Sequence, residues 1–487
     1  MEDPVDLKTP GVYIVEMDAF PNSVVEVATA VPAFIGYTEK ADNNGNGLRN
    51  LPWRISSQAD FEAYFGGQAK AGFSIVDTTP DTQPSGPLTF EVSRVSVPYA
   101  LYSCMRLFFD NGGGACYVAS VGSYADTIAE GDLLRGIDAL LREEEPTMVV
   151  IPEAVYLPDE ASCIRVQQAA LLHCGDKTKS RVAILDIFNG YRDRKDPAGD
   201  CVANFRKAIG ANQLDYGAAY YPWLNTSVFG NDDATWEMAL GSGLQKLLKQ
   251  EGKVSQKLLS EIPSPVGHTP LEIHRALWAV SDVYKRVMAE IRRQMNLLPP
   301  SAAMAGVYSW VDAERGVWAA PANVGAASVV SPAVNISDHD QEDLNVDIQG
   351  KSINAIRAFV GEGVLVWGAR TLDGNSLEWR YISVRRTVIF LEQSIRLAVR
   401  AYVFERNEAA TWATVKSMIG NFLTSVWKRG GLQGAQPDDA FQVLCGLGET
   451  MTAADVLNGI LRVTVMVAVT RPAEFIEMTF EQQMQTS

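Results

Sequence analysis

The segment Gln349–Ser352 carries residue types that bind nucleotide phosphates. It reads Gln, Gly, Lys, Ser, which matches the end of a P-loop, where the lysine and the hydroxyl reach the phosphates and magnesium. A P-loop also needs a glycine five positions before its Gly-Lys pair, and Asn345 occupies that position. Asp343 and Asp347 would in addition repel a triphosphate. The segment therefore argues against nucleotide binding.

Carboxylates between residues 338 and 347 could suggest a calcium loop. The EF-hand pattern requires Asp or Asn at its fifth position, glycine at its sixth and glutamate at its twelfth. Counted from Asp338, these positions hold Glu342, Asp343 and Gln349. We interpret the cluster as a solvated acidic linker.

The remaining candidates for chemistry have structural explanations. Gly112–Gly114 follows an expected helix, whereas phosphate loops lie where a strand enters a helix, so this run predicts a helix cap and a turn. The histidines show no HExxH or paired-ligand spacing, no GxSxG elbow occurs, and the cysteines form no CxxC pair. We predict buried free thiols and no catalytic, cofactor-binding or metal-binding residue. The histidines are His173, His268, His274 and His339, and the cysteines are Cys104, Cys116, Cys163, Cys174, Cys201 and Cys445.

The charge balance argues against nucleic acid as a partner. The 487 residues include 42 Lys and Arg against 58 Asp and Glu, a net charge of −16, whereas binding along nucleic acid depends on clustered cations. Residues 351–487 hold 14 basic and 13 acidic residues, so the acidic surplus lies in residues 1–350. The last part of the chain is nearly neutral.

The sequence also argues against direct membrane insertion. The start MEDPVDLKTPG lacks the positive region and apolar run of a secretory signal. The most apolar window, Val463–Val469, has the length of a strand and not of a membrane span. We expect synthesis and assembly in the cytoplasm, and presence outside the cell only after lysis or export by a dedicated route.

Hydrophobic periodicity predicts alternating strands and helices along the first half of the chain. This order is typical of an α/β sheet covered by helices, and the length of the chain allows two or three domains. The expected strands are Ala33–Tyr37, Cys116–Val121, Met148–Pro152, Val182–Ile187 and Ala218–Tyr221, and the expected helices are Val97–Phe109, Gly131–Arg142, Cys163–Cys174 and Asp200–Ile209.

Two polar stretches interrupt this order and predict outer insertions. They are Asp77–Pro87 and Asn225–Pro270, the second with a Lys-rich helix around Leu244–Leu259. Arg275–Leu298 predicts one long amphipathic helix that ends before two prolines. We expect a domain boundary near the acidic linker Asn335–Asp347.

The C-terminal part predicts two amphipathic helices followed by strands. Apolar residues recur at steps of three and four from Val388 to Tyr402 and again from Trp412 to Val426. Gly430 and Gly431 after the second series predict a left-handed helix cap. Alternation predicts a strand at 461–469 and, beyond Pro472, a second one at 476–481.

Six segments in this part resemble, in order, the signature of contractile tail sheath proteins. Their patterns are NAIR-F-G-G, VWGARTL, EWRY--VRR, NFLT--W--G-L-G, ETMT--D--NG and RPAEFI. Here they read Asn354–Arg357 with Phe359, Gly361 and Gly363; Val366–Leu372; Glu378–Tyr381 with Val384–Arg386; Asn421–Thr424 with Trp427, Gly430, Leu432 and Gly434; Glu449–Thr452 with Asp455, Asn458 and Gly459; and Arg471–Ile476. Ser301–Asn323 and the Gly112–Gly114 region also resemble this family.

The resemblance implies a mixed α/β, multidomain tail-sheath fold. In it, a C-terminal inner domain is completed by the N-terminal segment, and the rest forms outer α/β domains. The boundaries that we expect are 1–25 for an N-terminal arm and strand, 26–224 for an outer α/β domain, 225–345 for an insertion and return, 346–472 for the inner domain, and 473–487 for a C-terminal arm.

The resemblance also suggests roles for individual residues. Both arms would add strands to sheets of neighbouring subunits, and basic residues near the second amphipathic helix would face an inner tube. The basic pair Arg385–Arg386 would form part of a partner surface. The arm residues are Val12, Tyr13, Ile14, Val15, Glu474, Phe475, Ile476, Met478 and Phe480; the tube-facing candidates are Lys416, Lys428 and Arg429; and the inner-domain signature residues are Asn354, Arg357, Trp367, Gly368, Arg370, Trp379, Arg380, Arg385 and Arg386.

The implied function is that of a structural subunit and not of an enzyme. Such subunits stack as six-fold rings around an inner tube protein and contract to drive the tube through a target envelope. The expected partners are further copies of the chain, the tube, baseplate and terminator or cap proteins, and sheath paralogues where these exist, with no cofactor. Phage tails, pyocin-like particles and injection systems remain open, and the excursion at 225–270 favours an injection system. The alternatives are an α/β nucleotide-binding or hydrolytic enzyme with a C-terminal assembly module, and a static shell or surface-layer protein.

Overall fold

The computed structural model describes residues 23–80, 88–262, 268–475 and 477. The chain divides into two compact units. The large unit comprises residues 28–390 and 470–487, and the small unit comprises residues 1–27 and 391–469. The expected arm residues Val12–Val15, Ile476, Met478 and Phe480 lie outside the described residues.

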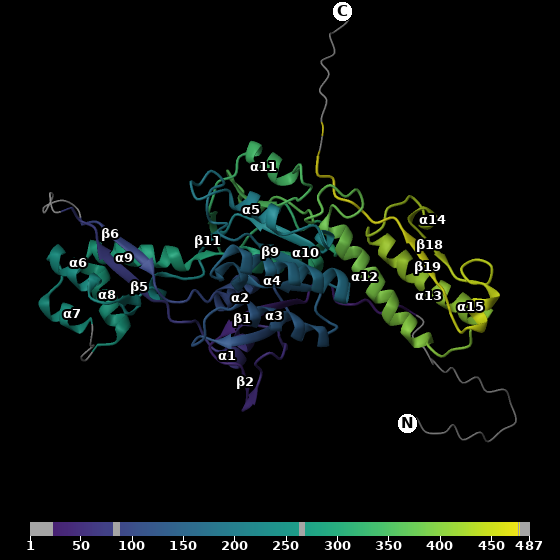
Figure 1. Ribbon diagram of the computed structural model, residues 1–487, viewed down its shortest axis with the longest axis horizontal. Coiled ribbons are helices and arrows are strands. Elements are labelled where there is room, and N and C mark those ends of the chain that lie inside the picture. The colour runs from purple at the N-terminus through teal and green to yellow at the C-terminus, as the bar shows by residue number, and fades with distance from the viewer. Residues whose placement is uncertain (1–22, 81–87, 263–267, 476, 478–487) are drawn as a thin grey trace, which may run out of the picture. The chain divides into compact units, whose positions relative to one another are not determined.

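A nine-stranded sheet forms the centre of the large unit (Figure 1). Its six inner strands, from β16 to β7, run parallel, and the three outer strands join them antiparallel. In order across the sheet, the strands are β14 (Val324–Gly325), β17 (Gly363–Val366), β16 (Asn354–Phe359), β10 (Gly217–Tyr221), β9 (Val182–Asp186), β8 (Met148–Val150), β1 (Pro32–Thr38), β7 (Cys116–Ser123) and β4 (Trp53–Ile55).

The sheet is covered by helices on both faces, which is why its inner strands are continuous apolar runs. Every residue of β1, β9 and β10 is buried. On β1, Ile35 approaches Gly136 of α3, whereas the next residue, Gly36, approaches Leu101 of α2. Because successive strand residues point to opposite faces, α2 and α3 cover opposite sides. The helices around the sheet are α1 (Gln58–Phe65), α2 (Leu101–Asp110), α3 (Glu130–Ala139), α4 (Glu160–Leu172), α5 (Cys201–Ala208) and α10 (Ser301–Arg315).

All five strands and all four helices expected in the first half of the chain are confirmed. Next to the two interrupting stretches, whose residues 81–87 and 263–267 lie outside the described residues, the large unit contains a part with small sheets of its own. This part contains the sheet β12 (Ala239–Leu240), β5 (Phe73–Asp77) and β6 (Phe90–Arg94), and the sheet β13 (Leu297–Leu298), β11 (Leu224–Thr226) and β15 (Val329–Pro332). A short hairpin, β2 (Asp42–Asn43) with β3 (Asn46–Gly47), lies between β1 and β4 along the chain.

Two expected single helices are each divided in two. The Lys-rich helix consists of α6 (Gly243–Glu251) and α7 (Gln256–Glu261), because Gly252 adopts a left-handed conformation at φ +74°. The long helix expected at 275–298 consists of α8 (Pro270–Val280) and α9 (Asp282–Met295). Ser281 separates them with extended backbone, and its hydroxyl accepts a hydrogen bond from the Tyr284 N–H at 3.0 Å. Both single-helix predictions were wrong for the same reason: a capping residue stops a helix without breaking its apolar periodicity.

The expected acidic linker is a helix, α11 (Asp338–Asn345). Ser337 and Asp340 form a capping box at its start, and Leu344 is fully buried. The side chains of Asp338 and Glu342 are solvated, as expected, but the segment is a capped helix and the prediction of a linker was wrong. The two compact units divide after Phe390 and not near this segment.

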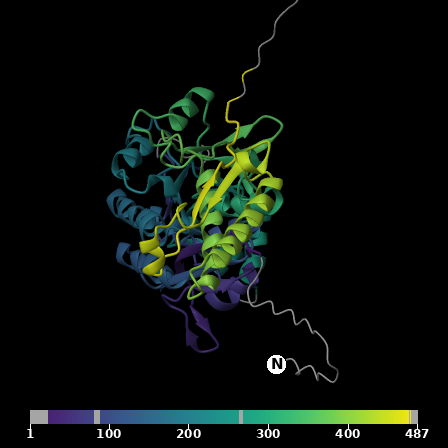
Figure 2. The same ribbon diagram turned by 90° about the vertical axis from the view of Figure 1, so that its right-hand side faces the viewer.

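The small unit contains one long helix packed on a two-stranded sheet (Figure 2). The helices expected from apolar periodicity are confirmed as α12 (Ile382–Val399), which begins in the large unit, and α13 (Ala409–Lys428). Gly430 follows α13 at φ +87°, as expected for a left-handed cap. The strand expected at 461–469 is shorter. The other elements are α14 (Pro437–Ala440), β18 (Phe441–Leu444), α15 (Ala453–Leu457) and β19 (Thr464–Val467).

Candidate assembly surfaces

The first part of the signature, residues 353–386, is called the signature segment here, and it begins on β16 at the edge of the parallel part of the sheet. The Asn354 side chain is buried, and its Oδ1 accepts from the Arg370 N–H at 2.8 Å while its Nδ2 donates to the Arg370 carbonyl at 2.8 Å. Gly368 lies so close to Asn354 that a Cβ there would be 2.9 Å from the Asn354 Cα. Asn354 and Gly368 together hold the loop after β17 in one position, and this loop carries Arg370.

Arg370 binds Glu474 near the C-terminal end of the described chain. Arg370 Nε lies 2.9 Å from Glu474 Oε1, and Nη2 lies 2.6 Å from Oε2. Tyr381 Oη and Asn345 Nδ2 donate to the same carboxylate at 3.1 and 2.9 Å. Burial disfavours the charged carboxylate, but the hydrogen bonds from Arg370 and Asn345 outweigh it and hold the pKa of Glu474 below its ordinary value. Glu474 therefore binds its own large unit, whereas Phe475 is 73% exposed.

The basic pair Arg385–Arg386 is buried inside the large unit. Arg386 forms a two-pronged ion pair with Asp312 of α10 at 2.6 and 2.9 Å, and each of these side chains is 4% exposed. Arg385 pairs with Asp215, and its guanidinium lies 3.5 Å from the centre of the Trp379 ring. The interpretation of this pair as part of a partner surface was wrong, because both charges are neutralised within the chain.

The other signature residues lie nearer the surface. Arg357 pairs with Asp338 at 2.8 Å and donates to Gln341 at 2.7 Å, both on α11. Trp367 is 37% exposed and stacks at a tilt on Phe359, with 4.6 Å between ring centres. The Arg380 carbonyl accepts from the Thr371 N–H at 2.8 Å. These residues join α11 and the loop after β17 to the edge of the sheet.

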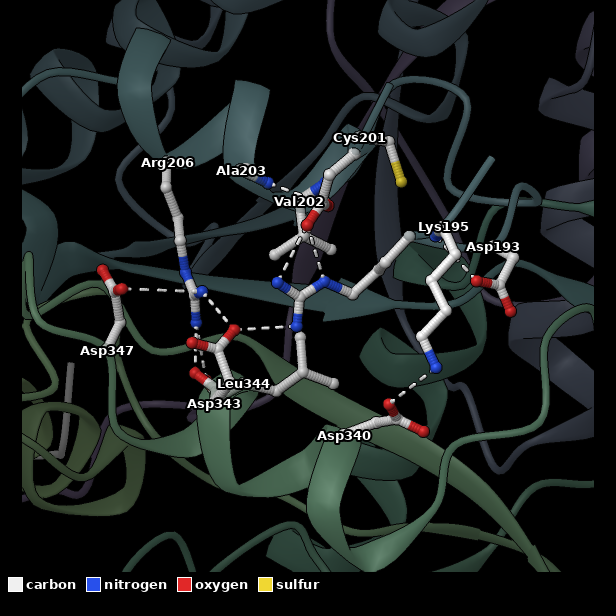
Figure 3. Close-up of polar contacts among 12 residues, drawn as sticks. Asp193, Lys195, Cys201, Val202, Ala203, Arg206, Asp340, Asp343, Leu344 and Asp347 are labelled. Carbon is white, nitrogen blue, oxygen red and sulfur yellow. Dashed lines mark hydrogen bonds and ion pairs between the residues drawn. The ribbon is translucent and has the colours of Figure 1, made fainter. Parts of the chain in front are cut away.

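Arginines from α5 and the loop before it fix the acidic helix α11 (Figure 3). Arg206, with a 4% exposed side chain, donates to the Asp343 carboxylate at 2.9 Å and to the Lys351 carbonyl at 2.9 Å. Arg194 lies 2.7 Å from the same Asp343 carboxylate and also binds Asp200, which caps α5. Burial opposes ionisation of Asp343, but the arginines hold its pKa below the ordinary value. The two arginine partners of Asp343 within the chain give the cluster a structural explanation.

The segment that resembles a P-loop is used for internal contacts. Lys351 is buried, its ammonium donates to the Arg206 carbonyl, and burial lowers its pKa. The Ser352 hydroxyl donates to the Asn345 carbonyl at 2.6 Å. The two side chains that would reach a phosphate therefore already have partners in the chain.

The tube-facing candidates lie on the surface of the small unit. Lys416 is 3.3 Å from Glu449, and Arg429 is bound to Glu26 with one contact of 3.2 Å. Lys428 is exposed and has no ion pair within the part of the chain that the structure describes. Large apolar side chains are exposed on the same unit, among them Phe404 (103%) and Leu457 (88%).

Within the described ranges, no cluster of His, Cys, Asp or Glu could hold a metal ion. All six cysteines are buried and unpaired, as expected. A search of the described helices finds none that is both long and apolar enough to cross a bilayer.

The geometry can be compared with known proteins. Residues 375–483 match the model of the phage tail sheath C-terminal domain. The structure of the anti-feeding prophage helical sheath in its contracted state aligns over 98% of this chain and 100% of that chain, with 28% identity and a TM-score of 0.63. The chain is similar to contractile tail sheath proteins over nearly its whole length. The mixed α/β fold class is confirmed by the same alignment.

Two further relatives support this similarity to sheath proteins. The sheath of an extracellular contractile injection system, the PVC sheath complex in its contracted state, shares 28% identity over 99% of each chain, with a TM-score of 0.59. The tail sheath protein of Vibrio phage KVP40 is 25% identical over 163 residues. That alignment spans 33% of this chain and 23% of the phage protein. Both relatives are sheath proteins.

Several residues of the chain that hold the signature segment were not found from the sequence. Asp215 and Asp312 neutralise Arg385 and Arg386, and Arg194 and Arg206 bind α11. Asp312 lies within Ser301–Asn323, a stretch that resembles the sheath family, so its importance could have been inferred. Asp215, Arg194 and Arg206 carry no sequence signal, because their partners lie far away along the chain.

Proposed function

We propose that the chain is the repeating subunit of a contractile sheath, which stacks as six-fold rings around an inner tube and drives the tube through a target envelope. The observation that carries this proposal is the match, over 98% of the chain, to a sheath in its contracted state. The subunit acts mechanically and not as an enzyme. It is made in the cytoplasm, and lysis releases it as part of a particle.

The small sheet supports strand exchange between subunits. In the described residues, β18 and β19 pair only with each other, apart from a bridge between Leu432 and Val469. A two-stranded sheet is marginal on its own, and no residue of β19 is buried. The expected arms, at Val12–Val15 and beyond Phe475, would complete such a sheet in a neighbour by adding strands.

Contraction requires no nucleotide in this proposal. If compaction buried roughly 200 Å² more apolar surface per subunit, it would contribute about 5 kcal/mol at 25 cal/mol per Å², before entropic costs. The partners are further copies of the chain, the tube protein and the baseplate, with a terminator protein at the far end and any sheath paralogues present.

The test is production of the full chain together with its tube and baseplate, followed by electron microscopy. We expect particles in two states that differ in sheath length and diameter. Deletion of residues 1–17 should abolish sheaths of normal length, because the N-terminal arm would be lost. A shell with one fixed length and diameter would contradict contraction, and normal contractile sheaths from the deletion variant would contradict the arm.

The alternative enzyme is tested by the same preparation. Measured binding of ATP or GTP that is lost in Lys351→Ala would favour it. We expect no such binding, because the Lys351 ammonium already has an acceptor in the chain.

A further inference from the structure

The chain passes between its two units three times, and the signature segment lies next to all three crossings. The crossings are between Val27 and Ala28, between Phe390 and Leu391, and between Val469 and Thr470. Just inside the large unit, Thr29 follows the first crossing, Arg386 precedes the second and Glu474 follows the third. Each of these residues takes part in a partly buried contact of the signature segment.

At Glu474, both carboxylate oxygens accept hydrogen bonds from the large unit. Arg370 occupies both oxygens with its two-pronged ion pair, and Tyr381 and Asn345 each add one hydrogen bond. The side chain of Arg370 is 3% exposed and that of Glu474 is 19% exposed. Two-pronged, charge-assisted pairs that exclude water are among the strongest polar contacts in proteins. Asn354 holds the Arg370 backbone at both its N–H and its carbonyl, so the donor itself cannot shift.

The contact at Thr29 has the same construction. Arg386 Nη2 donates to the Thr29 carbonyl at 3.0 Å while the same guanidinium pairs with Asp312. The Thr147 hydroxyl donates to the same carbonyl at 2.7 Å. The Arg386 guanidinium also lies 4.8 Å from the centre of the Tyr308 ring. The backbone of Thr29 is therefore tied to α10 and to the sheet.

We propose that the signature segment binds both chain ends to the large unit, at Thr29 and at Glu474. We call these two residues the N-terminal and C-terminal roots, and the contacts that hold them the N-terminal and C-terminal anchors. Arg370, with Tyr381 and Asn345, holds the C-terminal root at Glu474, and Arg386 holds the N-terminal root at Thr29. Arg370 and Arg386 are thus positioning residues for the two arms. This inference deepens the proposed function and depends on it for one consequence. A neighbour that pulls on the C-terminal arm therefore loads the nine-stranded sheet of the large unit and not the two-stranded sheet of the small unit.

The C-terminal anchor is tested by limited chymotrypsin cleavage of the full-length chain after Phe475. The exposed ring of Phe475 is available to the protease, but cleavage also needs freely extended backbone, which bound Glu474 opposes. Arg370→Gln should release the peptide 476–487 roughly ten- to hundredfold faster, the range for loss of one charge-assisted hydrogen bond. Tyr381→Phe should increase the rate by a smaller factor, because the ring remains and one hydrogen bond is lost.

The control for this experiment is Arg181→Gln. Arg181 is as buried as Arg370, but it donates to the carbonyls of Leu140 and Glu143, which belong to neither arm. The Arg181→Gln variant should release the peptide 476–487 at the same rate as the wild type. All variants are kept well below their melting temperatures. An unchanged rate in Arg370→Gln, or an equal increase in Arg181→Gln, would overturn the C-terminal anchor.

The N-terminal anchor is tested by deuterium uptake in residues 28–33. The Val31 N–H donates to the Thr147 hydroxyl at 2.9 Å, so it reports on the position of this segment. Arg386→Gln should raise uptake there by roughly tenfold in rate, and unchanged uptake would overturn this anchor. Both experiments use the unassembled chain, so a wild-type chain that forms no sheath would contradict only the proposed function. If Arg370→Gln releases the peptide 476–487 faster and still assembles normal numbers of sheaths, the proposal that the C-terminal arm transfers load to the large unit would be overturned.

Discussion

The large unit and the small unit bury their strands to different degrees. All seven residues of β1 are buried, and so are all residues of β9 and β10. In the small unit β19 has no buried residue, and in β18 only Val443 is buried. The stability of the large unit therefore comes from its own core, whereas the sheet of the small unit is suited to pairing with other chains.

The two units also use their basic residues differently. Arg206, Arg370 and Arg386 of the large unit are buried and paired with carboxylates of the same unit. Lys416 and Lys428 of the small unit point toward solvent, with Lys416 in a half-exposed ion pair. Charge holds the large unit together, and on the small unit it is available to a partner.

The largest expected effect is in the core of the large unit. Phe108 is fully buried, and its ring centre lies 5.0 Å from that of Phe34. Phe108→Ala should lower the free energy of unfolding by about 3–5 kcal/mol, because it leaves a cavity beneath the sheet. Chemical denaturation measures this loss. The matched change Met466→Ala, at a 46% exposed position of β19, should cost under about 0.5 kcal/mol. Equal losses of unfolding free energy in Phe108→Ala and Met466→Ala would contradict the difference in burial between the two units.

The second effect is pH dependence from a buried carboxyl of the large unit. Burial raises the pKa of Asp186 from 3.8 to about 7, and the Ser301 N–H donates to it at 2.8 Å. The carboxyl of Asp186 binds its proton more tightly in the folded state than in the unfolded state. The contribution of this protonated carboxyl to the free energy of unfolding is therefore complete below about pH 4. It is lost as the pH rises to about 7.

Asp186→Asn removes this titration and keeps the contacts, since an amide can accept from the Ser301 N–H and donate to its hydroxyl. Relative to the wild type, the free energy of unfolding of the variant should rise between pH 4 and pH 8 by up to about 4 kcal/mol. Denaturation curves at several pH values measure the difference. A difference that does not change with pH would contradict the assignment to Asp186.

The smallest effect on stability is expected at Lys428, in the last turn of α13. Lys428→Glu should change the free energy of unfolding by less than about 1 kcal/mol, through the unfavourable helix dipole. It should nevertheless reduce the amount of sheath assembled on tubes, counted by electron microscopy. Lys207→Glu is the matched control, because Lys207 is an exposed lysine in the last turn of α5. Equal assembly by both variants would remove Lys428 from the tube surface.

The strands of the large unit could be predicted because buried parallel strands are continuous apolar runs, as at Val182–Ile187. The break at Ser281 was missed because apolar periodicity continues through it. The capping box at Ser337 and Asp340 was present in the sequence and predicts the start of α11. The acidic residues that follow look solvated unless their partners are known, and Arg206 lies more than 100 residues earlier.

The signature residues could be identified by resemblance, but their surroundings could not. Two adjacent arginines, Arg385 and Arg386, look like a surface patch in the sequence. Their carboxylate partners come from two other elements, near Asp215 and Asp312. Only the folded sheet brings these together. Glu474 was expected in an arm, and its binding to Arg370 depends on the path of the chain back to the large unit.

The six buried cysteines have a practical consequence for the oxidation and labelling of the chain. Burial raises the pKa of every one of these thiols, to about 12 for Cys174 and Cys201. Thiolates are the reactive form, so the folded chain should form few stray cross-links in the presence of oxidants. It follows that a single cysteine introduced on the surface would be the one readily alkylated group, which allows neighbouring subunits to be labelled without removing any native residue.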